Sequence, residues 1–309
     1  MQHRFFVGHI CAFMLSISAT ALEAREVTLR HQGLTLNADF ELAAGKQPAD
    51  GVILITHGGL AHRSMEDIAY LQRLLNEKGY STLNINLSLG LDNRHGMYDC
   101  KVTHRHRNGD AAVEIGAWVE WLKIQGTKRV VLLGHSRGGA QTALYAAQQD
   151  NAVVQAIALL APAIRENTDA VGYQQRYQKP LAPLLEKAQQ FVNNGKGDTV
   201  LEHIGLLTCP ETAATADAFV SYYGQDAQID TPSLLPKLRK PTLVVIAGSD
   251  EIVIGLDKKV APLADGKRVQ MKIIEGADHT FRDLYADDAV DAIDAFLQNI
   301  EGWSQRKTP

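Results

Sequence analysis

The stretch VVLLGHSRGG, residues 130–139, decides the fold of this 309-residue chain. Its four leading apolar residues predict a buried β-strand, and the alanine-rich residues 140–147 that follow predict a helix. Between them lies the pattern Gly134-x-Ser136-x-Gly138, in which the glycines let the backbone turn sharply and pack closely. A serine at such a turn holds its hydroxyl clear of the sheet, at a helix N-terminus that favours developing negative charge. The stretch therefore predicts Ser136 as a nucleophile.

Apolar strands and helices alternate on both sides of this stretch. Residues 26–42 alternate around a glycine and predict an edge hairpin. The expected core strands are residues 51–56, 80–86, 130–133, 152–160, 241–247 and 268–274, and the expected helices are residues 65–78, 110–125, 140–147, 257–263 and 287–300. Continuous apolar strands joined by helices predict an α/β fold, with a mostly parallel central β-sheet and helices on both of its faces.

The alternation breaks between residues 164 and 235. Aromatic and leucine residues there predict helices, with a glycine turn at residues 195–197 and a helix over residues 213–223. We therefore expect a helical cap or lid, residues 164–235, inserted into a core formed by residues 22–163 and 236–309. The aromatic side chains of the insertion would either wall an apolar site or pack within the cap.

The first 21 residues have the layout of a secretory signal peptide. Arg4 precedes an apolar run over residues 5–18, and residues 19–21 give a small-x-small cleavage pattern, with cleavage after Ala24 as a second possibility. The run is too short to span a membrane comfortably, so a retained anchor helix is the lesser alternative. We expect a secreted or periplasmic protein with no stable membrane insertion after cleavage. The formal net charge of −4 lacks the basic excess that nucleic-acid binding requires, so no nucleic-acid partner is expected.

Two cysteines remain after cleavage at residue 21, because Cys11 lies within the removed segment. Cys100 and Cys209 would then face an oxidising compartment, in which disulfides form and persist. This predicts a disulfide between them, and two separate buried thiols are the alternative.

A serine hydroxyl needs a base to take its proton and a third group to orient that base. Sites in open α/β sheets gather at the carboxyl ends of the strands, so the partners are sought there. Asp250 follows the strand that ends at residue 247, and His279 follows the strand that ends near residue 274. The order Ser136, Asp250, His279 is the one expected when the serine of the turn comes first. Glu251 beside Asp250, and Asp169 after the preceding strand, are the alternative acids.

With these residues in place, the chain resembles the α/β-hydrolases over about residues 27–163 and 236–301, the insertion being unmatched. The resemblance implies Ser136 as nucleophile, His279 as general base and then acid, and Asp250 as the group that holds the imidazole. It also implies an oxyanion hole made by two backbone N–H groups. The residues matching these positions are Arg137, directly after the serine, and Gly59 in the stretch His57-Gly58-Gly59-Leu60, with Leu60 as the alternative donor and His57 as a brace of the loop. No cofactor is implied.

Residues 87–107 show no periodicity and predict a long loop rich in glycine, histidine and arginine. His104 and His106 have a spacing that can hold a metal, but no third ligand accompanies them, so no metal site is expected. The basic residues of the loop would either receive an anionic substrate or pair locally with the acidic residues around them.

These features predict a serine hydrolase that cleaves carboxylic esters, with a small-molecule ester as its substrate. A serine peptidase or amidase would use the same three residues, and only the pocket would distinguish it. A binding protein that keeps the fold without catalysis is the alternative from another class. The sequence does not predict an oligomeric state.

Overall fold

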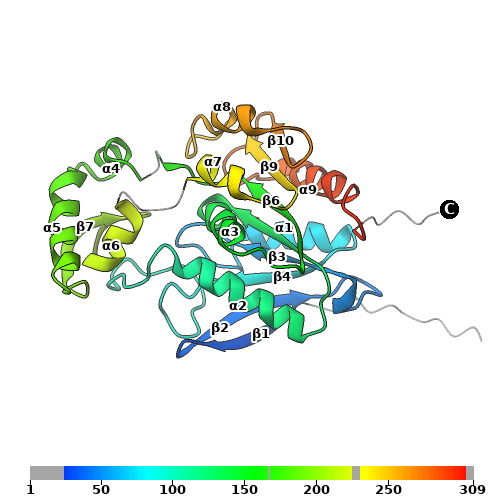
Figure 1. Ribbon diagram of the computed structural model, residues 1–309, viewed down its shortest axis with the longest axis horizontal. Coiled ribbons are helices and arrows are strands. Elements are labelled where there is room, and N and C mark those ends of the chain that lie inside the picture. The colour runs from blue at the N-terminus through cyan, green and yellow to red at the C-terminus, as the bar shows by residue number, and fades with distance from the viewer. Residues whose placement is uncertain (1–23, 166–167, 225–229, 304–309) are drawn as a thin grey trace, which may run out of the picture.

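The computed structural model of the chain describes residues 24–165, 168–224 and 230–303. Its centre is an eight-stranded sheet in the order β1-β2-β4-β3-β5-β6-β9-β10 (Figure 1). The strands are β1 (Arg25–His31), β2 (Leu34–Glu41), β3 (Val52–Thr56), β4 (Ser81–Asn86), β5 (Val130–His135), β6 (Val154–Leu160), β9 (Thr242–Ala247) and β10 (Val269–Ile274). The signal peptide predicted for residues 1–21 lies outside the described residues.

The sheet is mostly parallel, as the alternation of strands and helices predicts. β4, β3, β5, β6, β9 and β10 run parallel to one another. The first two strands form the expected edge hairpin, which joins the sheet through antiparallel pairing of β2 with β4. All residues of β3, β4, β5 and β9 are buried, because helices cover both faces of the sheet.

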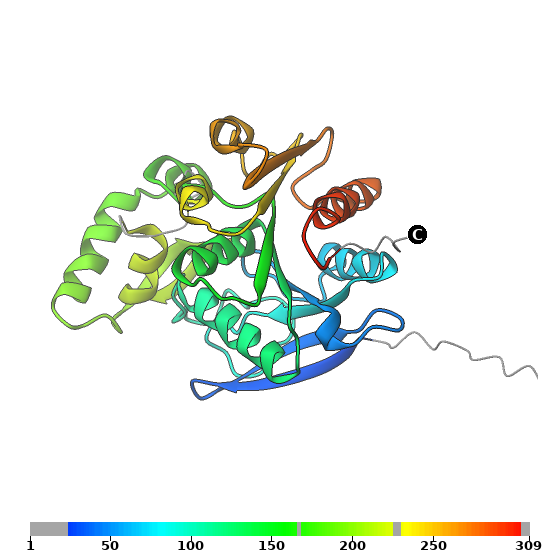
Figure 2. The same cartoon turned by 45° about the vertical axis from the view of Figure 1, so that its right-hand side comes forward.

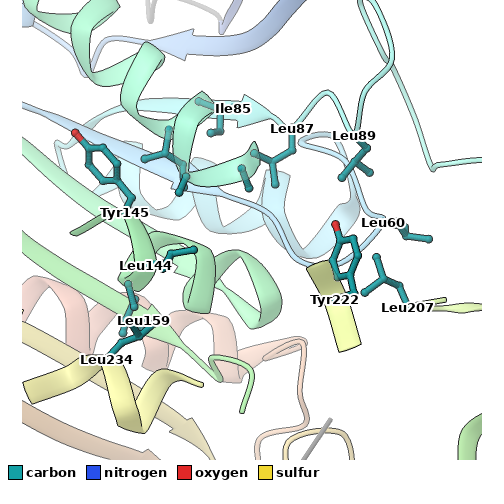
Figure 3. Packing of buried hydrophobic residues seen from close by; sticks show 14 of the residues in the cluster. Leu60, Ile85, Leu87, Leu89, Leu144, Tyr145, Leu159, Leu207, Tyr222 and Leu234 are labelled. Atoms are coloured by element: carbon teal, nitrogen blue, oxygen red, sulfur yellow. The ribbon is translucent and has the colours of Figure 1, made fainter. Parts of the chain in front are cut away.

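Two hydrophobic layers enclose the sheet. α1 (Glu66–Glu77) and α9 (Leu284–Leu297) cover one face, while α2 (Asp110–Ile124), α3 (Ser136–Gln148) and the short α8 (Leu256–Val260) cover the other. Figure 2 shows α1 and α9 together on one side of the strands. Alternate residues of β5 enter different layers. Leu132 belongs to the same cluster as Leu144 and Leu159, which Figure 3 labels, whereas Val131 and Leu133 belong to the cluster that includes α1 and α9.

The segment between residues 164 and 235 lies largely to one side of the main sheet (Figure 1). It contains α4 (Ala170–Tyr177), α5 (Leu181–Asn193), β7 (Val200–Leu206), β8 (Cys209–Thr215), α6 (Ala216–Tyr223) and α7 (Thr231–Leu234). The prediction of a purely helical insertion is therefore wrong over residues 200–215, where β7 and β8 form a separate antiparallel pair. The helix expected from residue 213 begins only at Ala216, after Thr215, whose side chain accepts a hydrogen bond from the Ala218 amide.

The long loop before α2 is tied to this hairpin. Cys100 and Cys209 form the predicted disulfide, with their Cα atoms 5.5 Å apart. Beyond it, the His104 amide donates to the Ala213 carbonyl at 2.8 Å, and the His104 carbonyl accepts from Thr215 at 2.9 Å. The loop therefore gives β8 a second strand-like partner. Within the described ranges, no helix is long and apolar enough to cross a membrane.

Candidate active site

Ser136 occupies the turn between β5 and α3 with a backbone φ of 55°. A positive φ is strained for a residue other than glycine and persists only when the surroundings enforce it. Two glycines enforce it here by allowing close backbone contact. A side chain at Gly134 would collide with Gly138 and Thr142, and one at Gly138 would collide with the carbonyl groups of Thr56 and His57. The glycine spacing of the sequence therefore reflects steric need.

Hydrogen bonds join the three predicted site residues in a single chain. The His279 Nε2 atom lies 2.8 Å from Ser136 Oγ, and its Nδ1 atom lies 2.8 Å from Asp250 Oδ2. A carboxylate can only accept, so Nδ1 carries a proton toward Asp250 and leaves Nε2 free to accept the proton of Ser136. The structure thus brings together residues that lie 143 and 29 positions apart in the sequence.

Asp250 is held by backbone as well as by His279. Its Oδ1 atom accepts hydrogen bonds from the amides of Ile252 at 2.7 Å and Val253 at 2.8 Å. Burial by itself raises the pKa of the Asp250 carboxyl, but the hydrogen bonds from His279, Val253 and Ile252 outweigh burial and leave the pKa lowered. Asp250 is therefore an anion at neutral pH.

The two alternative acids lie elsewhere. Glu251 is exposed, on the outside of the turn that buries Asp250. Asp169 is the N-cap of α4, where its Oδ1 atom accepts a hydrogen bond from the Gly172 amide at 2.7 Å. Neither carboxylate is the one that the imidazole of His279 contacts.

His135, the residue before the serine, fixes the position of His279. Its Nε2–H group donates to the His279 carbonyl oxygen at 2.8 Å, and the two rings lie 5.1 Å apart. The ring of His135 is buried, and this burial together with the neighbouring His279 lowers the pKa of His135. A neutral His135 can therefore hold the backbone of His279 without placing a second positive charge beside it.

The loop after β3 lies against the serine. A side chain at Gly58 would be 2.8 Å from the Ser136 Cβ atom, so only glycine fits. Gly59 follows with a φ of 46°, and Leu60 is buried. The described residues provide no hydrogen-bond acceptor for the N–H groups of Gly59, the predicted oxyanion donor of this loop, and of Leu60, its alternative.

His57 braces this loop. The Leu87 amide donates to His57 Nε2 at 3.1 Å, so the ring's proton lies on Nδ1, which donates to the Gly58 carbonyl at 3.2 Å. Complete burial, helped by the charge of Arg94, lowers the pKa of His57 to about 3. The ring is therefore neutral, and its two hydrogen bonds connect the loop after β3 with the end of β4.

Two cations of the loop at residues 87–107, Arg94 and Arg107, bind groups of the protein itself. Arg94 is buried and donates to the carbonyl oxygens of Leu87, Gly96 and Ala61. Arg107 forms an ion pair of 2.6 Å with Asp217 of α6. These contacts support local pairing of the loop's charges rather than reception of a substrate anion.

The two histidines of the loop are buried side by side and joined to the insertion. His104 Nδ1 lies 2.9 Å from His106 Nε2, and His106 Nδ1 lies 2.8 Å from the Tyr222 hydroxyl. Burial lowers the pKa of His104 to about 4 and that of His106 to about 3. Over the described ranges no group of three or more metal-ligating side chains occurs.

The sequence of the chain matches the family Hydrolase_4, described as serine aminopeptidase, S33, over residues 47–282. That range contains the serine turn, the histidine and the carboxylate described above, and it covers most of the chain. The chain belongs to this family of α/β-hydrolases. No curated protein in the comparison matches it.

Solved structures share the hydrolase fold at low sequence identity. Est1E from Butyrivibrio proteoclasticus with bound ferulic acid is 19% identical, covering 87% of this chain and 97% of that one, with a TM-score of 0.64. The α/β-hydrolase GrgF from Penicillium sp. sh18 is 16% identical, covering 90% and 98%, with a TM-score of 0.65. The Pyrococcus furiosus esterase Pf2001 is 17% identical, covering 90% and 93%, with a TM-score of 0.58. At these identities the likeness concerns the fold.

Within this hydrolase, three residues of the site could not be placed from the sequence: His135, Gly58 and Arg94. His135 and Gly58 stand inside the quoted motifs, yet their contacts with His279 and Ser136 depend on how separate loops meet. Arg94 looks like one of several loop cations, and only its burial among carbonyl groups distinguishes it. A histidine at the end of an otherwise apolar strand, directly before Ser136, is the signal that could have identified His135.

Proposed function

We propose that the protein is a serine hydrolase that cleaves carboxylic esters, with Ser136, His279 and Asp250 as its catalytic triad. The observation that carries this proposal is the hydrogen-bond chain from Ser136 through His279 to Asp250, both links being 2.8 Å. This hydrogen-bond chain has the direction that catalysis requires, because its anionic end is at Asp250 and the accepting nitrogen of His279 faces the serine.

The reaction proceeds in two halves. Ser136 Oγ attacks the ester carbonyl carbon while His279 Nε2 takes the hydroxyl proton, and the backbone N–H groups of Arg137 and Gly59 hold the resulting oxyanion. The C–O bond to the alcohol then breaks, and His279 returns the proton to that oxygen. Water attacks the acyl-serine in the same way, with His279 as base, and releases the carboxylic acid and free Ser136.

A serine aminopeptidase activity is the second candidate, because the matching family carries that description. An aminopeptidase must receive the free ammonium group of its substrate, which requires negative charge close to the nucleophile. The residue next to Ser136 is instead Arg137, which is buried. This favours esters over peptides with a free N-terminus.

The proposal also includes the compartment of the protein and the division of the chain into a core and a cap. The disulfide between Cys100 and Cys209 supports an oxidising location, secreted or periplasmic, reached with residues 1–21 as signal peptide. Residues 164–235 act as the cap over the core, and small-molecule esters are the substrates. No cofactor takes part in the mechanism.

The test is hydrolysis of p-nitrophenyl esters with acyl chains from C2 to C16 by the protein without residues 1–21. We expect turnover that disappears in Ser136→Ala, and L-amino acid p-nitroanilides should be cleaved far more slowly than the best ester. Faster cleavage of the anilides would establish the aminopeptidase. Absence of turnover together with no fluorophosphonate adduct on Ser136 would show a binding protein instead.

A further inference from the structure

Three arginines are buried within the described residues, and one of them lacks an acceptor. Arg63 forms ion pairs with Glu26 and Asp39, and Arg94 donates to carbonyl groups. Arg137 is 7% exposed, yet within the described ranges its guanidinium makes no hydrogen bond or ion pair, and its Nη1 atom is fully enclosed. Burying a charge without a partner costs several kcal/mol, so the position calls for an explanation.

Among the described residues, the groups that act on this guanidinium supply no negative charge. The Arg137 Cζ atom lies 5.6 Å from the centre of the Tyr222 ring, a cation–π contact with α6. The ionisable groups that act on it most strongly are three phenols and another cation: Tyr177, Tyr222, Tyr223 and Arg176.

The hydroxyl groups of these tyrosines are already engaged. Tyr177 donates to the Leu207 carbonyl at 2.6 Å, Tyr223 accepts from the Leu207 amide at 3.1 Å, and Tyr222 contacts His106. Tyr222 packs in the same core cluster as Leu207 and Leu60, which Figure 3 shows with it. The wall around Arg137 is thus aromatic and polar but uncharged, apart from Arg176.

Arg137 is also next to the reacting atom in the chain. It follows Ser136 directly in α3, and its side chain extends to α6 of the insertion. A group held there would belong to a molecule whose other end reaches the serine. An acyl group on Ser136 is such a molecule, because it is covalently fixed one residue away from Arg137.

We propose that Arg137 binds a carboxylate carried by the acyl part of the substrate, so that the enzyme prefers half-esters of dicarboxylic acids over neutral esters. This inference rests on the proposed esterase function and names its substrate class. A guanidinium is planar and always charged, and its parallel N–H groups match the two oxygens of a carboxylate. The single negative charge of a carboxylate also neutralises the single charge of Arg137, whereas a phosphate dianion would exceed it.

The first test measures binding without catalysis. Ser136→Ala is titrated calorimetrically with monomethyl glutarate, with neutral dimethyl glutarate and with inorganic phosphate. We expect the monoester to bind at least ~10-fold more tightly than the diester, since hydrogen bonds to a charged group are worth more than neutral ones. Adding Arg137→Met should abolish this difference, whereas adding Arg107→Met, which removes a cation already paired with Asp217, should preserve it.

The second test uses the active enzyme and the ratio of kcat/KM for p-nitrophenyl hydrogen glutarate to that for p-nitrophenyl valerate. A ratio cancels any effect of substitution on the Arg137 backbone N–H group. The ratio should fall at least ~10-fold in Arg137→Met and less in Arg137→Lys, which keeps the charge but not the planar fork. Thermal unfolding adds a readout that a structural role would not give: Arg137→Met should raise the midpoint of the free protein, because a buried unpaired charge is removed.

Four results would overturn the inference: equal affinity for monoester and diester, an unchanged kcat/KM ratio in Arg137→Met, a lowered unfolding midpoint in that variant, or tighter binding of phosphate than of the monoester. Ester hydrolysis without selectivity would refute the carboxylate site alone. Selective binding without hydrolysis of any ester would refute the esterase alone.

Discussion

Replacing both cysteines by serine measures how much the disulfide stabilises the hydrolase. The bond between Cys100 and Cys209 spans 109 residues of sequence. In the chain-entropy model, a loop of that length removes about 16 cal/mol/K from the unfolded chain, which is about 5 kcal/mol at 25 °C. We expect Cys100→Ser/Cys209→Ser to lower the free energy of unfolding by about that amount, which is at least a third of the stability of a typical domain.

The same substitution should leave the active site intact while the protein is folded. The loop keeps its backbone contacts to β8 at His104, and the Leu87 amide still anchors His57. Because the chain-entropy effect acts on the unfolded state, kcat at 25 °C without denaturant should stay within about twofold of wild type. Stability and activity therefore separate in this variant.

The assay is urea unfolding of the protein without residues 1–21, followed by tryptophan fluorescence, with and without reductant. Reductant should destabilise the wild type and leave Cys100→Ser/Cys209→Ser unchanged, which is the internal control. A loss of less than about 1 kcal/mol at an unchanged m-value would refute the argument from the unfolded chain. A fall in kcat of the folded variant would show that the disulfide positions the site.

Three further substitutions address single contacts. Asp250→Asn keeps the shape of the side chain but no longer presents an anion to His279, so kcat for the best p-nitrophenyl ester should fall by about 10³–10⁴ while the free energy of unfolding changes little. A loss below tenfold would mean that Asp250 does not orient the base. His135→Phe keeps the ring but removes the donor to the buried His279 carbonyl, so the free energy of unfolding should fall by about 1–3 kcal/mol and kcat should fall more than KM rises. Unchanged kcat would show that His279 needs no such brace. Glu114, whose pKa burial raises to about 7, accepts hydrogen bonds from Ser88, and its protonated form is favoured by folding. Its stabilising contribution is complete below pH 4.5 and is lost as the pH rises through 7. Between pH 5 and pH 8 the wild type should therefore lose about 2.5 kcal/mol more free energy of unfolding than Glu114→Gln. Parallel stability curves of the two proteins would contradict this.

The sequence predicts the parts of the fold that local chemistry determines. Strands buried on both faces appear as unbroken apolar runs such as residues 130–133, and the glycines around Ser136 mark a turn that no larger residue allows. Asp250 and His279 were predicted for a related reason, since each follows an apolar strand at the same edge of a parallel sheet. Their separation in sequence did not matter, because topology brings strand ends together.

The insertion could not be predicted in the same way. β8 reads CPETAAT, a sequence with a proline, two alanines and two threonines in place of an apolar alternation. It is a strand because β7 pairs with it, because His104 bonds its backbone from the other side, and because the disulfide holds its first residue. β7 is a neighbour in the sequence, but His104 and Cys100 lie in the distant loop before α2. Helical propensity over residues 213–215 was therefore overridden by tertiary contacts.

Arg137 shows most clearly what a motif leaves out. The serine turn assigns a role only to the backbone N–H of the following residue, and for that role any side chain serves. The long loop at residues 87–107 drew attention to its own cations, yet Arg94 and Arg107 are satisfied by carbonyl groups and by Asp217. What distinguishes Arg137 is that it is enclosed and that no described carboxylate reaches it. A buried charge without a partner is unfavourable, and beside Ser136, the proposed nucleophile, the substrate is the partner that can reach it.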